Sequence, residues 1–410
     1  MTDLAPRTDP DVTAQRRTPA LVGAVWALLV INTLGSQGAE TIVPIPRPVA
    51  QMITMGAMIG ALVLALLLNP RMRFRSSAFL LLMSVLLVVS IASSVRLESG
   101  LGALFRCFRL SVFISTLWLL SPWWDNAMVF VRHHIRVLGA VLFTVAAGLL
   151  VAPGLAFPGV YSGRLVGAIW PLTPPQVGQY AAIVTGLTIM LWMGRRTDKW
   201  GVLTVALPAF VLLMLSHTRT ATIGLLAALT VGGLSLILTS ARARKVFSWA
   251  AVVIGVAAVA LGPVIQAWLQ RGQDEQNLAS LTGRQTVWDA LLAAPRTTSE
   301  ELFGVGLTNK SFNGLPIDNS WLSVYNDQGY IGVALVAMFL CTLIVVAVLR
   351  PPSLERSCAI FLIVYCIAAS YTEAGLGDAS PYLLNLAVAA ALLSRSPTPA
   401  MITPTRTATT

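Results

Sequence analysis

The chain has 410 residues, of which 56% are hydrophobic and only 11% are charged, whereas an ordinary soluble domain has about 25% charged residues. A mean hydropathy of +0.76 over the whole length excludes a soluble enzyme with one appended anchor. The net charge of +11 does not indicate nucleic acid as a partner, because most basic residues lie in short clusters between apolar blocks.

The apolar residues form blocks of about 17 to 23 residues, the length that a helix needs to cross a lipid bilayer. We therefore predict an all-α, polytopic integral membrane protein with about twelve transmembrane helices. After a disordered tail at 1–18, the expected spans lie at 19–36, 48–69, 77–95, 102–121, 137–155, 176–194, 200–216, 220–239, 246–268, 329–349, 357–372 and 380–394.

The organisation of the chain follows from these spans. Residues 19–268 form a bundle of the first nine spans, residues 269–328 form one large loop, and residues 329–394 hold the last three spans. The loop is expected to be ordered, because aromatic residues and leucines alternate in it with charges. The Pro- and Thr-rich residues 395–410 are expected to form a second disordered tail.

The distribution of basic residues predicts the orientation. Alternate segments between the spans, such as 71–75 and 195–199, hold most of the 28 basic residues. By the positive-inside rule these segments are cytoplasmic, so both termini of this multi-pass protein of the plasma (inner) membrane are cytoplasmic and the large loop faces outward.

Metal and cofactor chemistry finds no support in the sequence. The four cysteines lie inside apolar blocks and are expected to be buried thiols, and no His/Cys/Asp cluster has metal-ligand spacing. The chain has no GxSxG elbow and no P-loop. His133 and His134 lie beside two arginines in an expected cytoplasmic loop, so we expect both rings to be solvated.

Arginines on the outer side are the main candidates for a functional site. Arg164, Arg219 and Arg284 each lie at the foot of an outer loop or beside a span, and Arg106 and Arg109 share one face of the fourth span. A guanidinium group binds phosphate oxygens in a bidentate manner. The pattern indicates an outward-facing anion site, suited to a diphosphate. The alternatives are interfacial anchoring for the first three and snorkelling to the headgroups for the pair.

Two other polar residues have open roles. His217, two residues before Arg219, is either a base or a polar residue at a helix end. Asp318 precedes an apolar segment, where a carboxylate serves either as a general base or as the N-cap of a helix.

Five motifs occur in a fixed order: GRLVGAIWP at 163–171, SHTRTA at 216–221, LTGRQTVWDALL at 281–292, LFGVGL at 302–307 and DNSWLSVYNDQGYIG at 318–332. The ordered set resembles the O-antigen ligase and Wzy polymerase family, with the last three motifs in the large loop. The resemblance implies a glycosyltransferase that takes an undecaprenyl-diphosphate-linked glycan as donor. It transfers that glycan, with inversion and without metal, to a glycan or glycolipid acceptor outside the membrane.

The resemblance also implies roles for individual residues. The three motif arginines match positions that hold the diphosphate, Trp288 matches the tryptophan of the loop helix, and Asn319 matches the second residue of a His-Asn pair. We therefore expect Asp318, Arg219 and Arg284 to be catalytic. The residues expected to bind substrate are Arg164, Arg106, Arg109, His217, Trp288 and Asn319.

Two departures from the family pattern bear on the acceptor and the donor. Ligases have His where this chain has Asp318, and this difference favours a polysaccharide polymerase or a ligase for another acceptor. The family often has Pro-Asn where this chain has Pro174, Pro175 and Gln176, so a donor contact from this segment is in question. The sequence leaves the glycan and the oligomeric state open.

A transporter or flippase of lipid-linked glycans is the main alternative, because about twelve spans is also a common transporter count. Such proteins often show two repeated halves with a site near the membrane midplane. Here no half-repeat is visible, and the charged candidates gather at the outer surface. A peptidoglycan polymerase of the shape, elongation, division and sporulation type, and a receptor, are further alternatives.

Overall fold

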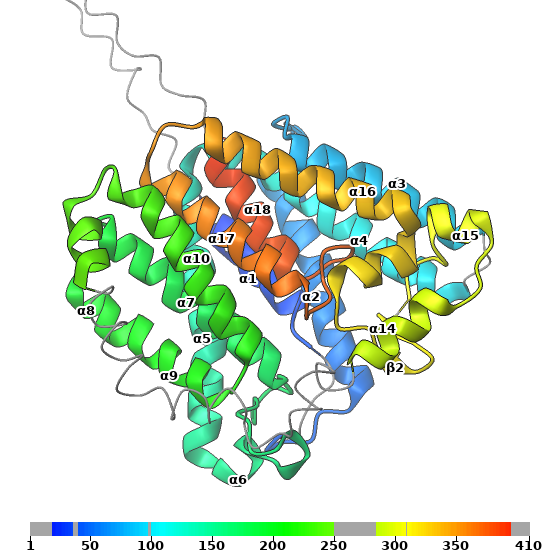
Figure 1. Ribbon diagram of the computed structural model, residues 1–410, viewed down its shortest axis with the longest axis horizontal. Coiled ribbons are helices and arrows are strands. Elements are labelled where there is room, and N and C mark those ends of the chain that lie inside the picture. Colours follow the sequence, from blue (N-terminus) through cyan, green and yellow to red (C-terminus); the bar gives the residue numbers. More distant parts are fainter. Residues whose placement is uncertain (1–18, 36–39, 97–99, 250–283, 309, 395–410) are drawn as a thin grey trace, which may run out of the picture.

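The computed structural model describes residues 19–35, 40–96, 100–249, 284–308 and 310–394, and these form a bundle of helices (Figure 1). The first half of the bundle contains α1 (Ala20–Asn32), α2 (Arg47–Leu68), α3 (Ala78–Arg96), α4 (Gly100–Leu120), α5 (Ala127–Val151), α6 (Pro153–Ala156), α7 (Pro174–Met193), α8 (Lys199–Gly201), α9 (Leu207–Leu215) and α10 (Arg219–Ile237). Short 3₁₀ turns lie at Ser121–Asn126 and Gly159–Tyr161, and a π-helical turn at Val202–Ala206 leads into α9.

The second half begins with small elements and ends with three long helices. It contains α14 (Arg284–Ala293), α15 (Thr298–Phe303), β1 (Ser311–Phe312), β2 (Leu315–Pro316), α16 (Ser320–Leu349), α17 (Leu354–Ser370) and α18 (Pro381–Leu393). The two strands form an antiparallel hairpin in which Ser311 is opposite Pro316. In Figure 1 the elements α14, α15 and β2 lie together at one side of the bundle.

The helices agree with the prediction of an all-α membrane protein. Among the described residues, six helical segments are long and apolar enough to cross a membrane: Arg47–Leu68, Ala78–Val95, Gly100–Asp125, Ala127–Val151, Arg219–Ile237 and Ser320–Leu349. The predicted span 246–268 falls almost wholly outside the described residues, and every other predicted span overlaps a helix. The count of twelve spans stays a prediction.

Two helices lie at the centre of the bundle. Nearly every residue of α18, and most of α7, is buried among neighbouring helices, as expected for a helix that is apolar all round. Helix α17 packs against both α10 and α18. This packing brings the starts of α7 and α10 to the same end of the bundle as the loop between α17 and α18.

One prediction in the first half is wrong. Helix α5 begins at Ala127, ten residues before the predicted span, and it contains both histidines that were expected in a solvated loop. His134 is buried: its Nδ1 accepts a hydrogen bond from Trp26 Nε1 at 3.2 Å, and its Nε2 lies 2.8 Å from Asn385 Oδ1. Partners from α1 and α18 satisfy both ring nitrogens, which is what allows an imidazole inside an apolar bundle.

The segment predicted to be a large loop, 269–328, ends earlier than expected. Helix α16 begins at Ser320 rather than at residue 329, so residues 320–328 are helical. A break at Gly329, with φ 64°, separates this polar first part from the apolar remainder. The predicted boundary therefore falls on the break and not on the start of the helix.

Candidate functional site

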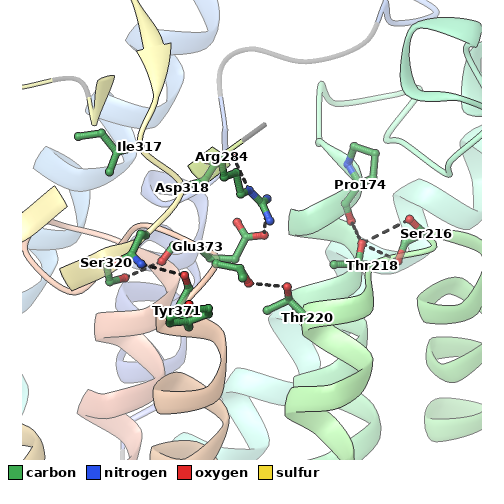
Figure 2. A network of polar contacts seen from close by, with 12 residues as sticks. Pro174, Ser216, Thr218, Thr220, Arg284, Ile317, Asp318, Ser320, Tyr371 and Glu373 are labelled. Carbon is green, nitrogen blue, oxygen red and sulfur yellow. Dashed lines mark hydrogen bonds and ion pairs between the residues drawn. The ribbon is translucent and has the colours of Figure 1, made fainter. Parts of the chain in front are cut away.

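Arg164 joins the first two motifs. Its Nε donates to the carbonyl oxygen of Ser216 at 3.1 Å and its Nη2 donates to Thr218 Oγ1 at 3.2 Å. The Thr218 hydroxyl in turn donates to the carbonyl oxygen of Pro174 at 3.0 Å, as Figure 2 shows. The side chain of Arg164 is thereby fixed against the turn between α9 and α10 and the first residue of α7.

Arg284 faces two carboxylates. Its Nε lies 3.3 Å from Asp318 Oδ2, and its Nη2 lies 3.8 Å from Glu373 Oε1 (Figure 2). Burial lowers the pKa of Arg164, an effect that Glu373 opposes and that the charges of Arg284 and Arg219 increase. Arg284 and Arg219 therefore both lie within electrostatic reach of Arg164. The role of the three arginines in binding an anion stays a prediction.

Glu373 was not among the predicted site residues. It lies in the loop between α17 and α18, and its side chain is only 19% exposed. Burial, together with the charge of Asp318, raises the pKa of Glu373 to about 7, although the neighbouring cations lower it. The available signal was an acidic pair, Glu373 and Asp378, in a short loop between the last two predicted spans.

The residues before α16 have roles that the sequence left open. The side-chain oxygen of Asn319 accepts from the backbone N–H groups of Trp321 at 2.9 Å and Leu322 at 3.0 Å, so Asn319 is the N-cap of α16. The N-cap alternative for Asp318 is therefore wrong. Asp318 has φ 40° and directs its carboxylate to Arg284. The amide nitrogen of Asn319 donates to the carbonyl oxygen of Tyr371 at 3.0 Å; its predicted substrate contact is untested.

Trp288 supports the segment that carries Asp318. Its Nε1 donates to the carbonyl oxygen of Ile317 at 2.7 Å, and its ring packs edge-on against Tyr371 with centroids 5.6 Å apart. The side chain of Ile317 is fully buried. These contacts fix the backbone directly before Asp318, so Trp288 positions Asp318 whether or not the ring also contacts substrate.

The glycines of the last two motifs allow a close contact between two backbones. Val305 N–H donates to the carbonyl oxygen of Asn326 at 2.8 Å, directly after Gly304. A Cβ added to Gly304 would lie 2.3 Å from the carbonyl carbon of Asp327, and one added to Gly329 would lie 2.4 Å from backbone of α15. Both glycines also have positive φ. Only glycine fits at these two positions, and the contact fixes both ends of the segment that bears Asp318.

Arg106 and Arg109 have structural partners. Arg106 Nη1 donates to the carbonyl oxygen of Leu307 at 3.2 Å, and Arg109 Nη2 donates to the carbonyl oxygen of Asn32, the last residue of α1, at 2.7 Å. Neither Arg106 nor Arg109 is among the described charges that act on Arg164. The predicted substrate contacts of this pair remain untested, and neither arginine is explained by snorkelling alone.

His217 lies on the sharp turn between α9 and α10. Its φ of 46° is in the left-handed region, and its backbone N–H donates to the carbonyl oxygen of Met214 at 3.1 Å. Its neighbours Ser216 and Thr218 are the two residues that hold Arg164. The position agrees with a polar residue at a helix end, and a role in binding substrate stays a prediction.

The site offers cations and two carboxylates. In the part of the chain that is described, no group of three or more His, Cys, Asp or Glu side chains is placed to hold a metal ion. The arrangement is suited to binding an anion and to accepting a proton beside it. No model of a known protein family matches the chain, and no curated protein is significantly similar to it in sequence.

Proposed function

We propose that the protein is a membrane glycosyltransferase that polymerises or transfers an undecaprenyl-diphosphate-linked glycan onto a glycan or glycolipid acceptor at the outer surface of the membrane. The observation that carries the proposal is the position of Arg284 beside two carboxylates, Asp318 and Glu373, with Arg164 close enough for its charge to act on Glu373 and for that of Arg219 to act on it. The resemblance of the motifs that bear the arginines supports the donor class.

The arginines act on the leaving group. The acceptor hydroxyl oxygen forms a bond to the anomeric carbon, the bond from that carbon to the diphosphate breaks, and the diphosphate leaves with the electron pair. Guanidinium groups already fixed in place stabilise the charge that develops there. Arg164 is anchored through Nε and Nη2, which leaves its Nη1 without a hydrogen-bond partner among the described residues.

Glu373 accepts the proton of the acceptor hydroxyl. A general base is most effective when its pKa lies near the working pH, and the pKa of Glu373, raised by burial to about 7, meets this condition. Asp318, which the sequence alone indicated as the base, orients Arg284 through their contact of 3.3 Å. A base near neutrality beside fixed cations is what a transfer to a sugar hydroxyl requires.

A transfer assay in vitro tests the proposal. Purified protein, undecaprenyl-diphosphate-linked glycan and candidate acceptors are incubated with and without EDTA, and products are separated by size. Removal of one group that stabilises a developing negative charge costs about 10²–10³-fold in rate. Arg284→Ala and Arg219→Ala are therefore expected to lose about that much, whereas Arg132→Ala, an exposed arginine of α5, is expected to retain activity.

The outcomes separate the alternatives. A ladder of products indicates a polymerase, a single product indicates a ligase, and activity in EDTA indicates a metal-independent reaction. Movement of the lipid-linked glycan across the bilayer without any new glycosidic bond would favour the transporter or flippase. Wild-type transfer by both arginine variants would overturn the assignment of the site.

A further inference from the structure

A second concentration of positive charge lies at the other end of the central helices. Helices α7 and α10, which are 20 and 19 residues long, begin at the candidate site. At a rise of about 1.5 Å per residue these helices span about 30 Å, close to the thickness of the apolar part of a bilayer. At their other ends, Trp192 of α7, the residues 195–199 that follow it, and Arg242, which follows α10, line a hollow of about 470 Å³. In Figure 1, α8 marks this end of the bundle.

The hollow carries an unbalanced positive charge. Its lining contains Arg195, Arg196, Lys199 and Arg242, and the only carboxylate in the lining is that of Asp198. Asp198 already has a structural role, because its Oδ1 accepts from the backbone N–H of Gly201 at 2.9 Å as the N-cap of α8. No salt bridge within the described ranges neutralises any of the four cations.

Backbone contacts hold this lining in place. Arg242 Nη1 donates to the carbonyl oxygen of Trp192 at 2.8 Å, and its guanidinium lies 5.4 Å from the centre of the Trp192 ring. Arg196 N–H donates to the carbonyl oxygen of Leu191 at 2.8 Å, and Arg195 has φ 59°, which together form a tight turn at the end of α7. The positive-inside rule explains basic residues on this side of a membrane, but not their assembly around a hollow.

An apolar surface borders the hollow. Trp200 is 60% exposed next to Lys199. Beyond it, the turn before α9 and the first half of α9 expose large apolar side chains, Leu203, Leu207, Phe210 and Val211. Tryptophan is common at the level of lipid headgroups, and exposed apolar residues beyond it are common along acyl chains. The surroundings therefore suit a molecule with an anionic head and an apolar tail.

We propose that this hollow binds the headgroup of an anionic phospholipid, with its phosphate among Arg195, Arg196 and Arg242 and its acyl chains along α9. Basic pockets between transmembrane helices are a known means of binding anionic headgroups. The volume of about 470 Å³ is ample for such a headgroup. This site is independent of the proposed transferase activity, because it lies at the opposite ends of α7 and α10.

Native mass spectrometry of the whole protein in detergent tests the proposal. Phosphatidylglycerol is expected to remain bound under conditions that remove phosphatidylcholine. Each basic residue near an anionic lipid surface contributes about fivefold in affinity. The double variant Arg195→Asn/Arg196→Gln is therefore expected to bind phosphatidylglycerol about 25-fold more weakly. Asparagine is chosen at 195 because it tolerates positive φ.

Controls separate the site from general surface charge. The variant Arg71→Gln/Arg73→Gln removes the same charge from exposed positions of the loop after α2 and is expected to bind as the wild type does. Equal losses in both double variants would overturn the proposal. Lys199→Gln, an exposed substitution, is expected to weaken binding about fivefold and provides a second test if the double variant misfolds.

The source of the phosphate is tested separately. Inorganic phosphate and glycerol phosphate are added in place of the lipid, and protection against heat unfolding is measured. Phosphatidylglycerol is expected to protect the wild type at concentrations where neither soluble anion does. Equal protection by inorganic phosphate, with no further gain from lipid, would identify a free-anion site and overturn the lipid proposal.

Discussion

Glu373 and Asp318 both contact Arg284, but they differ in exposure: the side chain of Glu373 is 19% exposed and that of Asp318 is 36% exposed. A base must be deprotonated to act, and the pKa of Glu373 is raised to about 7. Transfer by the wild type is therefore expected to fall as the pH is lowered through about 7. Glu373→Gln is expected to lose about 10²–10⁴-fold in turnover and to lose this pH dependence, measured as the pH–rate profile of transfer.

Asp318→Asn is the matched variant for this experiment. It keeps the size of the side chain and weakens the hold on Arg284, so turnover should fall. The dependence on pH should be retained but move to lower pH, because the charge of Asp318 no longer raises the pKa of Glu373. The opposite pattern, in which Asp318→Asn removes the pH dependence and Glu373→Gln retains it, would assign the role of base to Asp318 instead.

Asn319 gives a second prediction at the scale of one residue. Asn319→Ala removes the N-cap of α16 and is expected to lower the free energy of unfolding by about 1 kcal/mol for the cap alone. Loss of the bond to the Tyr371 carbonyl oxygen adds to this effect. The measurement is thermal unfolding in detergent followed by circular dichroism.

Asn319→Asp separates the two contributions, because it keeps the capping oxygen but lacks the N–H donor. An Asn319→Ala variant as stable as the wild type would show that the cap contributes nothing here, and would leave room for the substrate contact that the family resemblance implies.

Individual site residues could be predicted from the sequence where their type, a charged side chain, is rare in the chain. Arg164, Arg219 and Arg284 stood out because charge is rare in so apolar a chain, and the structure places the second and third within electrostatic reach of the first. The sequence did not indicate Glu373, because basic residues determine the orientation of a membrane protein and acidic residues contribute little to it. Asn319 caps α16 in place of Asp318 because Asp318 has a positive φ angle, and no spacing in the sequence indicates that angle.

At the scale of elements, the contact between α15 and α16 depends on Gly304. Gly304→Ala adds a Cβ that would lie 2.3 Å from the carbonyl carbon of Asp327, so the two elements must separate. We expect a marked fall in melting temperature and loss of transfer activity, because the segment that bears Asp318 is displaced. Both are measured on protein purified in detergent.

Gly314→Ala is the matched control. Gly314 has φ 80°, close to the 75° of Gly304, but nothing lies within 4 Å of an added Cβ. It should therefore show only the strain of the left-handed conformation, about 1–2 kcal/mol. Equal destabilisation by the two variants would mean that the backbone contact is not the cause.

Runs of apolar residues predicted where the helices lie, but they did not predict the polar first residues of α5 and α16. Helix α5 starts ten residues early because His134 finds partners on α1 and α18, and α16 starts nine residues early because Asn319 caps it. Hydropathy detects residues that face lipid. It does not detect a helix whose polar residues are satisfied by neighbouring elements.

At the scale of the whole molecule, the predicted orientation places the candidate site and the basic hollow beside α8 on opposite sides of the membrane. With Cys341 replaced by Ser, a single cysteine is introduced at Asn313, an exposed residue of the hairpin, or at Arg73, an exposed residue after α2. In sealed right-side-out vesicles, a membrane-impermeant maleimide is expected to label position 313. Position 73 is expected to react only after permeabilisation.

Labelling of position 73 but not of position 313 in intact vesicles would reverse the orientation. It would also remove the basis of the transferase proposal, because the lipid-linked donor is used at the outer surface. The architecture as a whole was predictable because the bilayer restricts it to bundles of apolar helices. The arrangement of α14, α15 and the hairpin was not, since it depends on contacts between distant parts of the chain.

The pairing of Val305 with Asn326, and of Gly306 with Asp327, closes the segment between them into a ring. The hairpin turn at Asn313 and Gly314 lies within this segment and is exposed. Length can therefore change at that turn without moving the fixed base, whereas one residue added between Asn319 and Asp327 would rotate the helix against its partners. Within the segment 305–327, the hairpin turn is therefore a place at which evolution or protein engineering can insert sequence without disturbing the paired backbones at its base.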